Sequence, residues 1–153
     1  MRTSWMAVGA ATILAMSGLG PARAAPPYKV GQVWSYDTRA QDSGSLLKIG
    51  AVEDEGAIGL VYHISLIGVR FGPDHRVTVV GHLPVSQSTL DTSVTELTPS
   101  DAIFPDPSQG ITEWRAAHGG VFTIPIKEII AAVDHMTPAP SSSPSSSLSS
   151  GAR

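Results

Sequence analysis

The chain has 153 residues, of which 42% are apolar and 15% are charged, with 10 Lys and Arg, 13 Asp and Glu, 5 His and no Cys. This length fits one domain and is too short for two of ordinary size. The net charge of −3 excludes a nucleic-acid-binding protein that depends on bulk positive charge. The lack of Cys excludes disulfides, zinc sites built on thiolates and a cysteine nucleophile.

The N-terminal residues have the three parts of a secretory signal peptide. Arg2 supplies a positive charge, residues 6–19 are uncharged and largely apolar, and a small-x-small cleavage sequence ends at Ala24. The apolar stretch is shorter than the roughly 20 residues that span a bilayer, which argues against a membrane anchor. We therefore expect residues 1–24 to be removed as a signal peptide. The mature protein would then have no membrane span and would be periplasmic or secreted, in a bacterium.

The C-terminal residues 137–153 form a Ser/Pro-rich stretch. They contain eight Ser and three Pro, and Leu148 is their one large apolar side chain. Such a stretch buries too little apolar surface to offset the entropy lost on ordering, so we expect a disordered tail. Residues 28–136 remain as the single folded domain, which is long enough to fold alone.

The first half of this domain has the alternating pattern of β-strands. The expected strands are residues 31–37, 45–52, 60–71 and 76–83. The connections between them are short, and two are rich in turn-forming residues, at 53–56 and 72–75. Short connections favour an antiparallel meander.

Helical patterns follow the strands. Ser86 or Ser88 is a candidate cap for a helix in which apolar residues recur with helical spacing as far as Leu97. Residues 111–118 are expected to form a short helix, 121–124 a last strand, and 125–133 a helix that starts at Pro125. The elements predict a single α+β domain with an antiparallel four- or five-stranded sheet and two or three helices on one side. A small antiparallel barrel is the alternative.

Three segments of the chain resemble a group of small bacterial proteins of unassigned function. These segments are YKVGQVWSY at 28–36 followed by Thr38-Arg39, HLPVS at 82–86 followed by Leu90-Asp91 and SVT at 93–95, and GVFTI at 120–124. The resemblance covers most of residues 28–133. It implies one compact domain and no particular activity.

Motifs for known catalytic chemistry are missing from the sequence. It contains no nucleophile elbow, no Ser-x-x-Lys, no glycine-rich phosphate loop and no His-Glu-x-x-His. Glu53, Asp54 and Glu55 are consecutive, and they do not supply the roughly six to eight oxygens that surround Ca²⁺. We expect them to lie in a solvated hairpin turn.

The pairing of the strands 60–71 and 76–83 decides whether two histidines lie together. If Phe71 pairs with Arg76, regular antiparallel pairing places Ile67 opposite Val80. Further along the same hairpin, the two histidines then lie diagonally across the strands on one face of the sheet. A change of one residue in register would place them on opposite faces.

The two histidines, His63 and His82, are the candidate metal ligands. Two neighbouring imidazoles would bind zinc or copper if an Asp or His118 completed the site. The alternative is that His63 lies on a half-exposed sheet face, where it is hydrogen-bonded or hydrated.

Trp114 and Arg115 are the candidate binding residues. They follow a Pro-rich loop at 104–107, and an exposed Trp beside an Arg is typical of interaction hot spots. Burial of Trp114 in the core is the alternative interpretation.

These observations favour a non-enzymatic binding or interaction protein of the bacterial cell envelope. Its partner would be a protein, with no nucleic acid and no cofactor. The alternative is a small-ligand or metal-binding domain, with zinc or copper, or an enzyme without a recognisable motif. Its site would be assembled from scattered residues such as His63, His82, Asp91 and His118.

Overall fold

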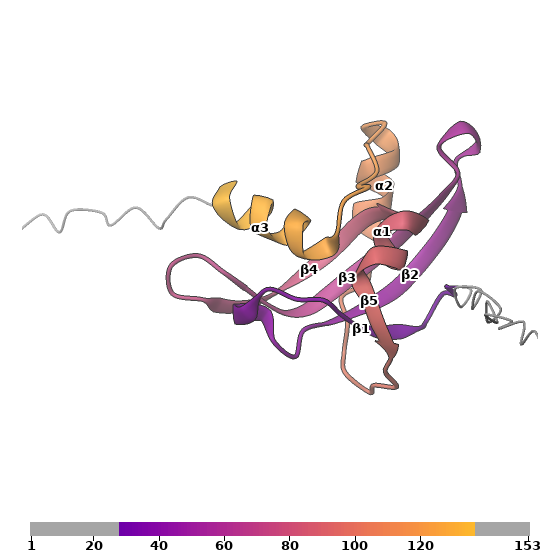
Figure 1. The fold of residues 1–153 in the computed structure, drawn as a ribbon. Coiled ribbons are helices and arrows are strands. Elements are labelled where there is room, and N and C mark those ends of the chain that lie inside the picture. The colour runs from indigo at the N-terminus through magenta and orange to yellow at the C-terminus, as the bar shows by residue number, and fades with distance from the viewer. Residues whose placement is uncertain (1–27, 137–153) are drawn as a thin grey trace, which may run out of the picture.

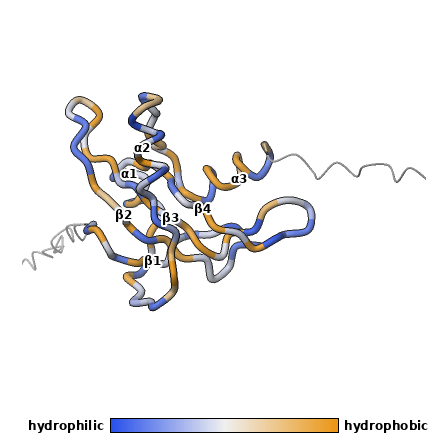
Figure 2. The backbone as a smooth tube through the Cα atoms, turned by 180° about the vertical axis from the view of Figure 1, so that it is seen from behind, coloured by the Kyte–Doolittle hydropathy of each residue, from blue (hydrophilic) through white to orange (hydrophobic). Residues whose placement is uncertain are grey.

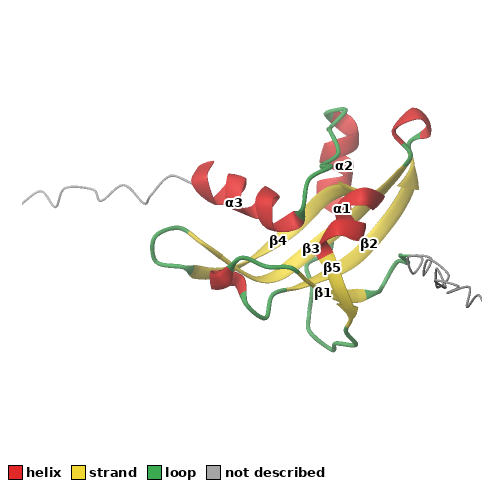
Figure 3. Cartoon of the chain, viewed as in Figure 1, coloured by secondary structure: helices red, strands yellow, loops and turns green. Residues whose placement is uncertain are grey.

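The computed structural model describes residues 28–136, and the predicted signal peptide and tail lie outside this range. Five strands form one sheet in the order β4-β3-β2-β1-β5, and three α-helices lie against it (Figures 1 and 3). Both ends of this order are edge strands, so the sheet is open. The predicted α+β fold with a five-stranded antiparallel sheet is confirmed, and the barrel does not form.

The strands and helices alternate little along the chain, because the first four strands form a meander. The strands are β1 Val33–Tyr36, β2 Leu46–Asp54, β3 Leu60–Phe71, β4 Arg76–Ser86 and β5 Val94–Leu97, and the helices are α1 Gln87–Ser93, α2 Ser108–Ala116 and α3 Ile126–Met136. All strand pairs are antiparallel. The prediction of an antiparallel meander is confirmed.

Two predicted elements are wrong. The helix expected to reach Leu97 ends at Ser93, and the next four residues form β5 on the open edge of β1. Val94 and Thr95 are β-branched and favour this extended pairing over another helical turn. Residues 121–124 form no strand, and only Phe122 makes an isolated parallel bridge, with Val85.

One face of the sheet carries the apolar core, and we call it the core face. Alternate residues of β3, namely Tyr62, Ile64 and Leu66, point to this face and are almost completely buried. Leu90 of α1 and the helix α3 cover them. Three isoleucines of α3 join the same cluster: Ile126, Ile129 and Ile130. Figure 2 shows the matching alternation of hydrophobic and hydrophilic residues along α3.

The opposite face carries Val61, His63 and Ser65, and we call it the histidine face. All three side chains are buried, and α2 packs over them, with the Trp114 ring 5.0 Å from the His63 ring. The prediction that all helices lie on one side is therefore wrong. The sheet is a middle layer, with α1 and α3 on one side and α2 on the other.

A partly buried ion network lies where β3 ends. Arg39 donates hydrogen bonds to Asp42 at 2.5 Å and to Asp134 at 2.8 Å, and the backbone N–H of Arg70 donates to Asp42 at 2.7 Å. Asp42 is only 1% exposed. The network ties the last turn of α3 to the end of β3.

Candidate functional site

The register of the β3–β4 hairpin differs from the regular pairing that the sequence analysis assumed. Phe71 pairs with Arg76 as expected, but Ile67 pairs with Val79 and not with Val80. The cause is a bulge at Gly68, which adds one residue to β3. Gly68 has φ +77, and a Cβ there would lie 3.3 Å from the Cα of Ser45, so both backbone conformation and space favour glycine.

A second bulge, which contains His82, restores the original register. Between the pairs Leu66–Val80 and Ile64–Leu83, β4 has one more residue than β3. The two shifts cancel, so His63 pairs with Pro84. His82, two residues earlier on β4, lies diagonal to His63 on the histidine face. The predicted placement of the two histidines on one face holds, although the pairing between them is not regular.

A third bulge places a carboxylate on the same face. On β2, Ile49 pairs with Ile64 and Ala51 pairs with His63, so Gly50 is the extra residue. Without this insertion, the alternation of β2 would direct Glu53 to the core face. The loop before α2 also packs tightly on Gly50, since a Cβ there would lie 2.5 Å from the Cγ of Pro107.

The side chains of Glu53, His63 and His82 form a cluster under α2, which we call the histidine cluster. The Nδ1 of His63 lies 2.8 Å from the Nε2 of His82, and the two rings stack with an interplanar angle of 23°. The other nitrogen of His63, Nε2, is buried without a hydrogen-bond partner. It lies 3.7 Å from Oε1 of Glu53.

These contacts favour one arrangement of protons in the neutral pair. If His82 donates its Nε2 proton to Nδ1 of His63, then His63 carries its own proton on Nε2, directed at the Glu53 carboxylate. The opposite tautomers would point a buried lone pair of His63 at a negative charge, which is unfavourable. The cluster is therefore a chain in which His82 donates to His63 and His63 faces Glu53.

Burial lowers the pKa of both histidines. For His63, the loss of hydration is the main cause. Glu53 opposes it, and His82 and Arg115 add to it. For His82, desolvation is again the main cause and Glu53 opposes it. Both imidazoles are consequently neutral at pH 7, so the cluster carries one negative charge, on Glu53, which Arg115 compensates.

The helix α2 is fixed to this cluster by its aromatic and charged residues. The ring of Trp114 meets the ring of His63 edge-on, at 72°, and Arg115 donates two hydrogen bonds to Glu53. Gly110 lies directly on the His82 ring, since a Cβ there would come within 2.4 Å of the His82 Cβ. The four predicted site residues, from three separate elements, thus meet in one place.

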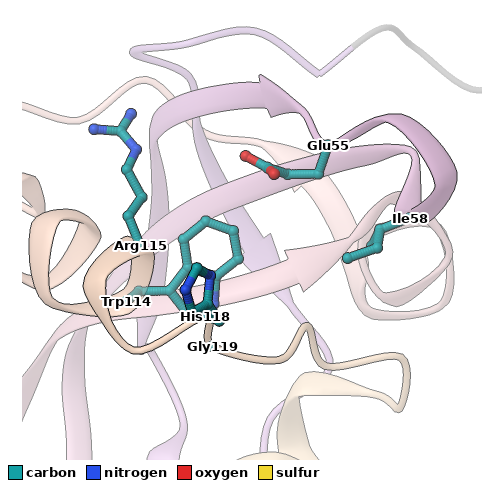
Figure 4. A pocket seen from close by; sticks show the side chains of 6 residues that line it. All are labelled: Glu55, Ile58, Trp114, Arg115, His118 and Gly119. Atoms are coloured by element: carbon teal, nitrogen blue, oxygen red, sulfur yellow. The ribbon is translucent and has the colours of Figure 1, made fainter.

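A pocket of about 260 Å³ lies beside the histidine cluster, and we call it the α2 pocket. It opens between the end of α2 and the β2–β3 hairpin (Figure 4). Its lining residues are Glu55, Ile58, Trp114, Arg115, His118 and Gly119. Trp114 is half-buried, and its indole N–H donates to the backbone oxygen of Gly120 at 2.9 Å. It is therefore held in one position while it forms part of the pocket wall.

Sequence reasoning missed the part that Glu53 plays. Glu53 belongs to β2 and not to the turn, and its side chain is only 18% exposed. The signal that could have found it is Gly50, whose position inside a strand indicates a bulge. Asp91 does not join the cluster: it belongs to α1, on the core face, where it accepts a hydrogen bond from Tyr28 at 2.8 Å. His118 lines the α2 pocket.

Within residues 28–136, no group of three or more His, Asp or Glu side chains has an arrangement suited to a metal ion. The helices of that same range are all too short or too polar to cross a bilayer. No known protein family, curated protein or solved structure shows significant similarity to this chain. The residues of the site itself are therefore the basis for a function of this chain.

Proposed function

We propose that this chain is an exported, non-enzymatic binding protein of the bacterial cell envelope that contacts a protein partner through the α2 pocket. The observation that carries the proposal is that Trp114 lines a pocket and is already held in place. Its ring contacts the ring of His63, and its N–H donates a hydrogen bond to Gly120. Trp and Arg are the residues most enriched in binding hot spots. A side chain fixed before binding loses little conformational entropy when a partner docks.

The size of the pocket favours a protein partner over a whole small molecule. Its volume of about 260 Å³ is below the range of roughly 300–1,000 Å³ that is usual for drug-sized ligands. A pocket of this size accommodates one inserted side chain. The remainder of the contact would be formed by the surrounding surface of α2 and the β2–β3 hairpin.

Native mass spectrometry of the protein purified gently from its own host tests this proposal. We expect a mature mass that corresponds to cleavage after Ala24, and a complex with a second protein. Trp114→Ala should lose at least about 2 kcal/mol of binding free energy, the range of a hot-spot residue. Val77→Ala is the control, because Val77 is exposed on β4 outside the α2 pocket. Equal complex formation by both variants would remove the α2 pocket from the proposal.

A second candidate function is metal binding by His63 and His82. The observation for it is that both imidazoles lie side by side on one face. Their facing nitrogens share a hydrogen bond at 2.8 Å, so an ion would have to replace that proton and recruit further ligands. The test is the zinc or copper content of the purified protein. His63→Gln together with His82→Gln should abolish stoichiometric uptake, and unchanged uptake would discard this candidate.

A further inference from the structure

We infer that the α2 pocket recognises a cationic side chain, Lys or Arg, presented by the partner protein. This inference rests on the proposed function and names the chemistry of the group that enters the pocket. It depends on three properties of the lining residues: their charge, their apolar surface and their hydrogen-bonding state.

The first property is an uncompensated negative charge. Within the described residues, the guanidinium of Arg115 forms an ion pair with Glu53, whereas Glu55 has no cation within salt-bridge distance. Asp54, next to Glu55, accepts a hydrogen bond only from the backbone N–H of Gly56. Within the described residues, Glu55 is therefore an acidic group of the pocket lining that no basic group neutralises, and Asp54 adds a second carboxylate next to it in the hairpin.

The second property is a pair of apolar walls. Ile58 is 63% exposed, so its aliphatic surface is open to a ligand. Together with Trp114 it lines the pocket (Figure 4). Lys and Arg have long aliphatic stems that pack on apolar surface while the charged end stays near polar groups. An indole ring also attracts a cation placed over its face.

The third property is that the indole N–H of Trp114 and the charge of Arg115 already have partners within the chain. The indole N–H is bonded to Gly120, and Nε and Nη2 of Arg115 are bonded to Glu53. Because the Arg115–Glu53 pair has no net charge, the π-face of Trp114 and the carboxylate of Glu55 are the lining features that attract a cation. The His118 imidazole also belongs to the lining.

The test is a titration of the mature protein, labelled with ¹⁵N, in which the indole N–H signal of Trp114 is followed by NMR. The probes are N-acetylarginine amide and its neutral isostere N-acetylcitrulline amide. A single side chain is expected to bind only in the millimolar range, about −4 kcal/mol, with at least tenfold weaker binding of the citrulline compound. Equal binding of the two compounds would overturn the inference.

A matched pair of variants tests whether the carboxylate of Glu55 is the group that binds the cation. Glu55→Gln should weaken binding of the arginine compound at least fivefold and leave the fold unchanged, because Glu55 is exposed. Glu96→Gln, which alters an exposed glutamate on β5, should have no effect. An equal loss in both variants would show a nonspecific charge effect and overturn the inference.

A third probe, a short peptide with one central Arg, separates the possible sources of the cation. Tighter binding of the peptide than of the arginine compound supports a side chain carried by a protein. Equal affinities would indicate a receptor for free cations and overturn the assignment to a protein. If no cation binds while Trp114→Ala still loses the complex in mass spectrometry, only the ligand class is wrong. If Trp114→Ala keeps the complex, the proposed function fails as well.

Discussion

The two faces of the sheet differ in the polarity of the side chains that they bury, although they share every strand of the β2–β4 meander. On the core face, alternate residues of β3 are apolar and pack against isoleucines of α3. On the histidine face, the same strand buries His63 and Ser65, at 0% and 1% exposure. Burying a polar group without a partner costs about 1–3 kcal/mol, and Nε2 of His63 is such a group.

The difference separates folding from function. The core face stabilises the fold by apolar burial. The histidine face buries polar side chains, which is less favourable for stability. Contacts from these side chains hold α2 beside the pocket. Departures from local rules of this kind are expected at functional sites. Three predictions test the comparison.

The largest effect is expected for Ile64→Ala on the core face. Ile64 is fully buried, and removing its side chain should lower the free energy of unfolding by about 2–5 kcal/mol, through lost burial and a cavity. Ile67→Ala is the matched control, because Ile67 is on the histidine side of the same strand and only half-buried. Its cost in urea unfolding should be clearly smaller. Equal costs would mean that both faces contribute alike to stability.

A smaller effect is expected from acidification. The lowered pKa values of His63 and His82 mean that the unfolded chain binds more protons than the folded one below the ordinary histidine value of about 6.5. The contribution of the two neutral histidines to the free energy of unfolding should be fully present above that pH. It should decrease as the pH falls toward the lowered pKa values. For each histidine, the free energy of unfolding should change by at most about 1.4 kcal/mol per pH unit.

The pH dependence should disappear in the double variant His63→Leu, His82→Leu. Replacing both partners of a buried polar pair by apolar groups is close to neutral for stability at pH 7. Urea unfolding between about pH 5 and 8 provides the measurement, and the three other histidines are unchanged in this variant. A full acid-dependent loss in the double variant would assign the effect to other groups.

The smallest effect is expected for Glu53→Gln. Arg115 is 58% exposed, so its ion pair with Glu53 should contribute only about 0.2–1 kcal/mol, less at high salt. Amide hydrogen exchange in α2 should nevertheless become faster, because Arg115 holds the helix to β2. Asp37→Asn breaks a comparable surface pair, with Lys127, and should leave α2 exchange unchanged. Unaltered exchange in Glu53→Gln would show that packing alone holds α2.

Local patterns were sufficient to predict most elements of the fold. The bounds of β3 agree with the structure at both ends, because Leu60–Phe71 is rich in β-branched and aromatic residues and a Gly-Pro turn follows. The α1–β5 boundary was missed, since a helical spacing of apolar residues continues through Val94. Helical pattern and β-branched composition compete there, and the open edge of β1 decides in favour of a strand.

The candidate site was predicted as two unrelated pairs of residues. Chain spacing placed His63 and His82 on neighbouring strands, and composition singled out Trp114 and Arg115. No local signal connects β3 to α2, because their contact depends on which face of the sheet the helix covers. That choice follows from the core face being already filled by α1 and α3.

The sequence by itself determined the antiparallel meander, the apolar core and the hairpin turns, because these depend on alternation and on turn-forming residues close in the chain. Tertiary structure decided how the site residues come together and that Glu53 joins them. Single-residue bulges change which face a side chain occupies, and at Gly50 the insertion brings Glu53 beneath Arg115. Between Gly68 and His82, two opposite shifts cancel and leave the histidines together. Such insertions are set by packing across the sheet, which no local stretch of sequence contains.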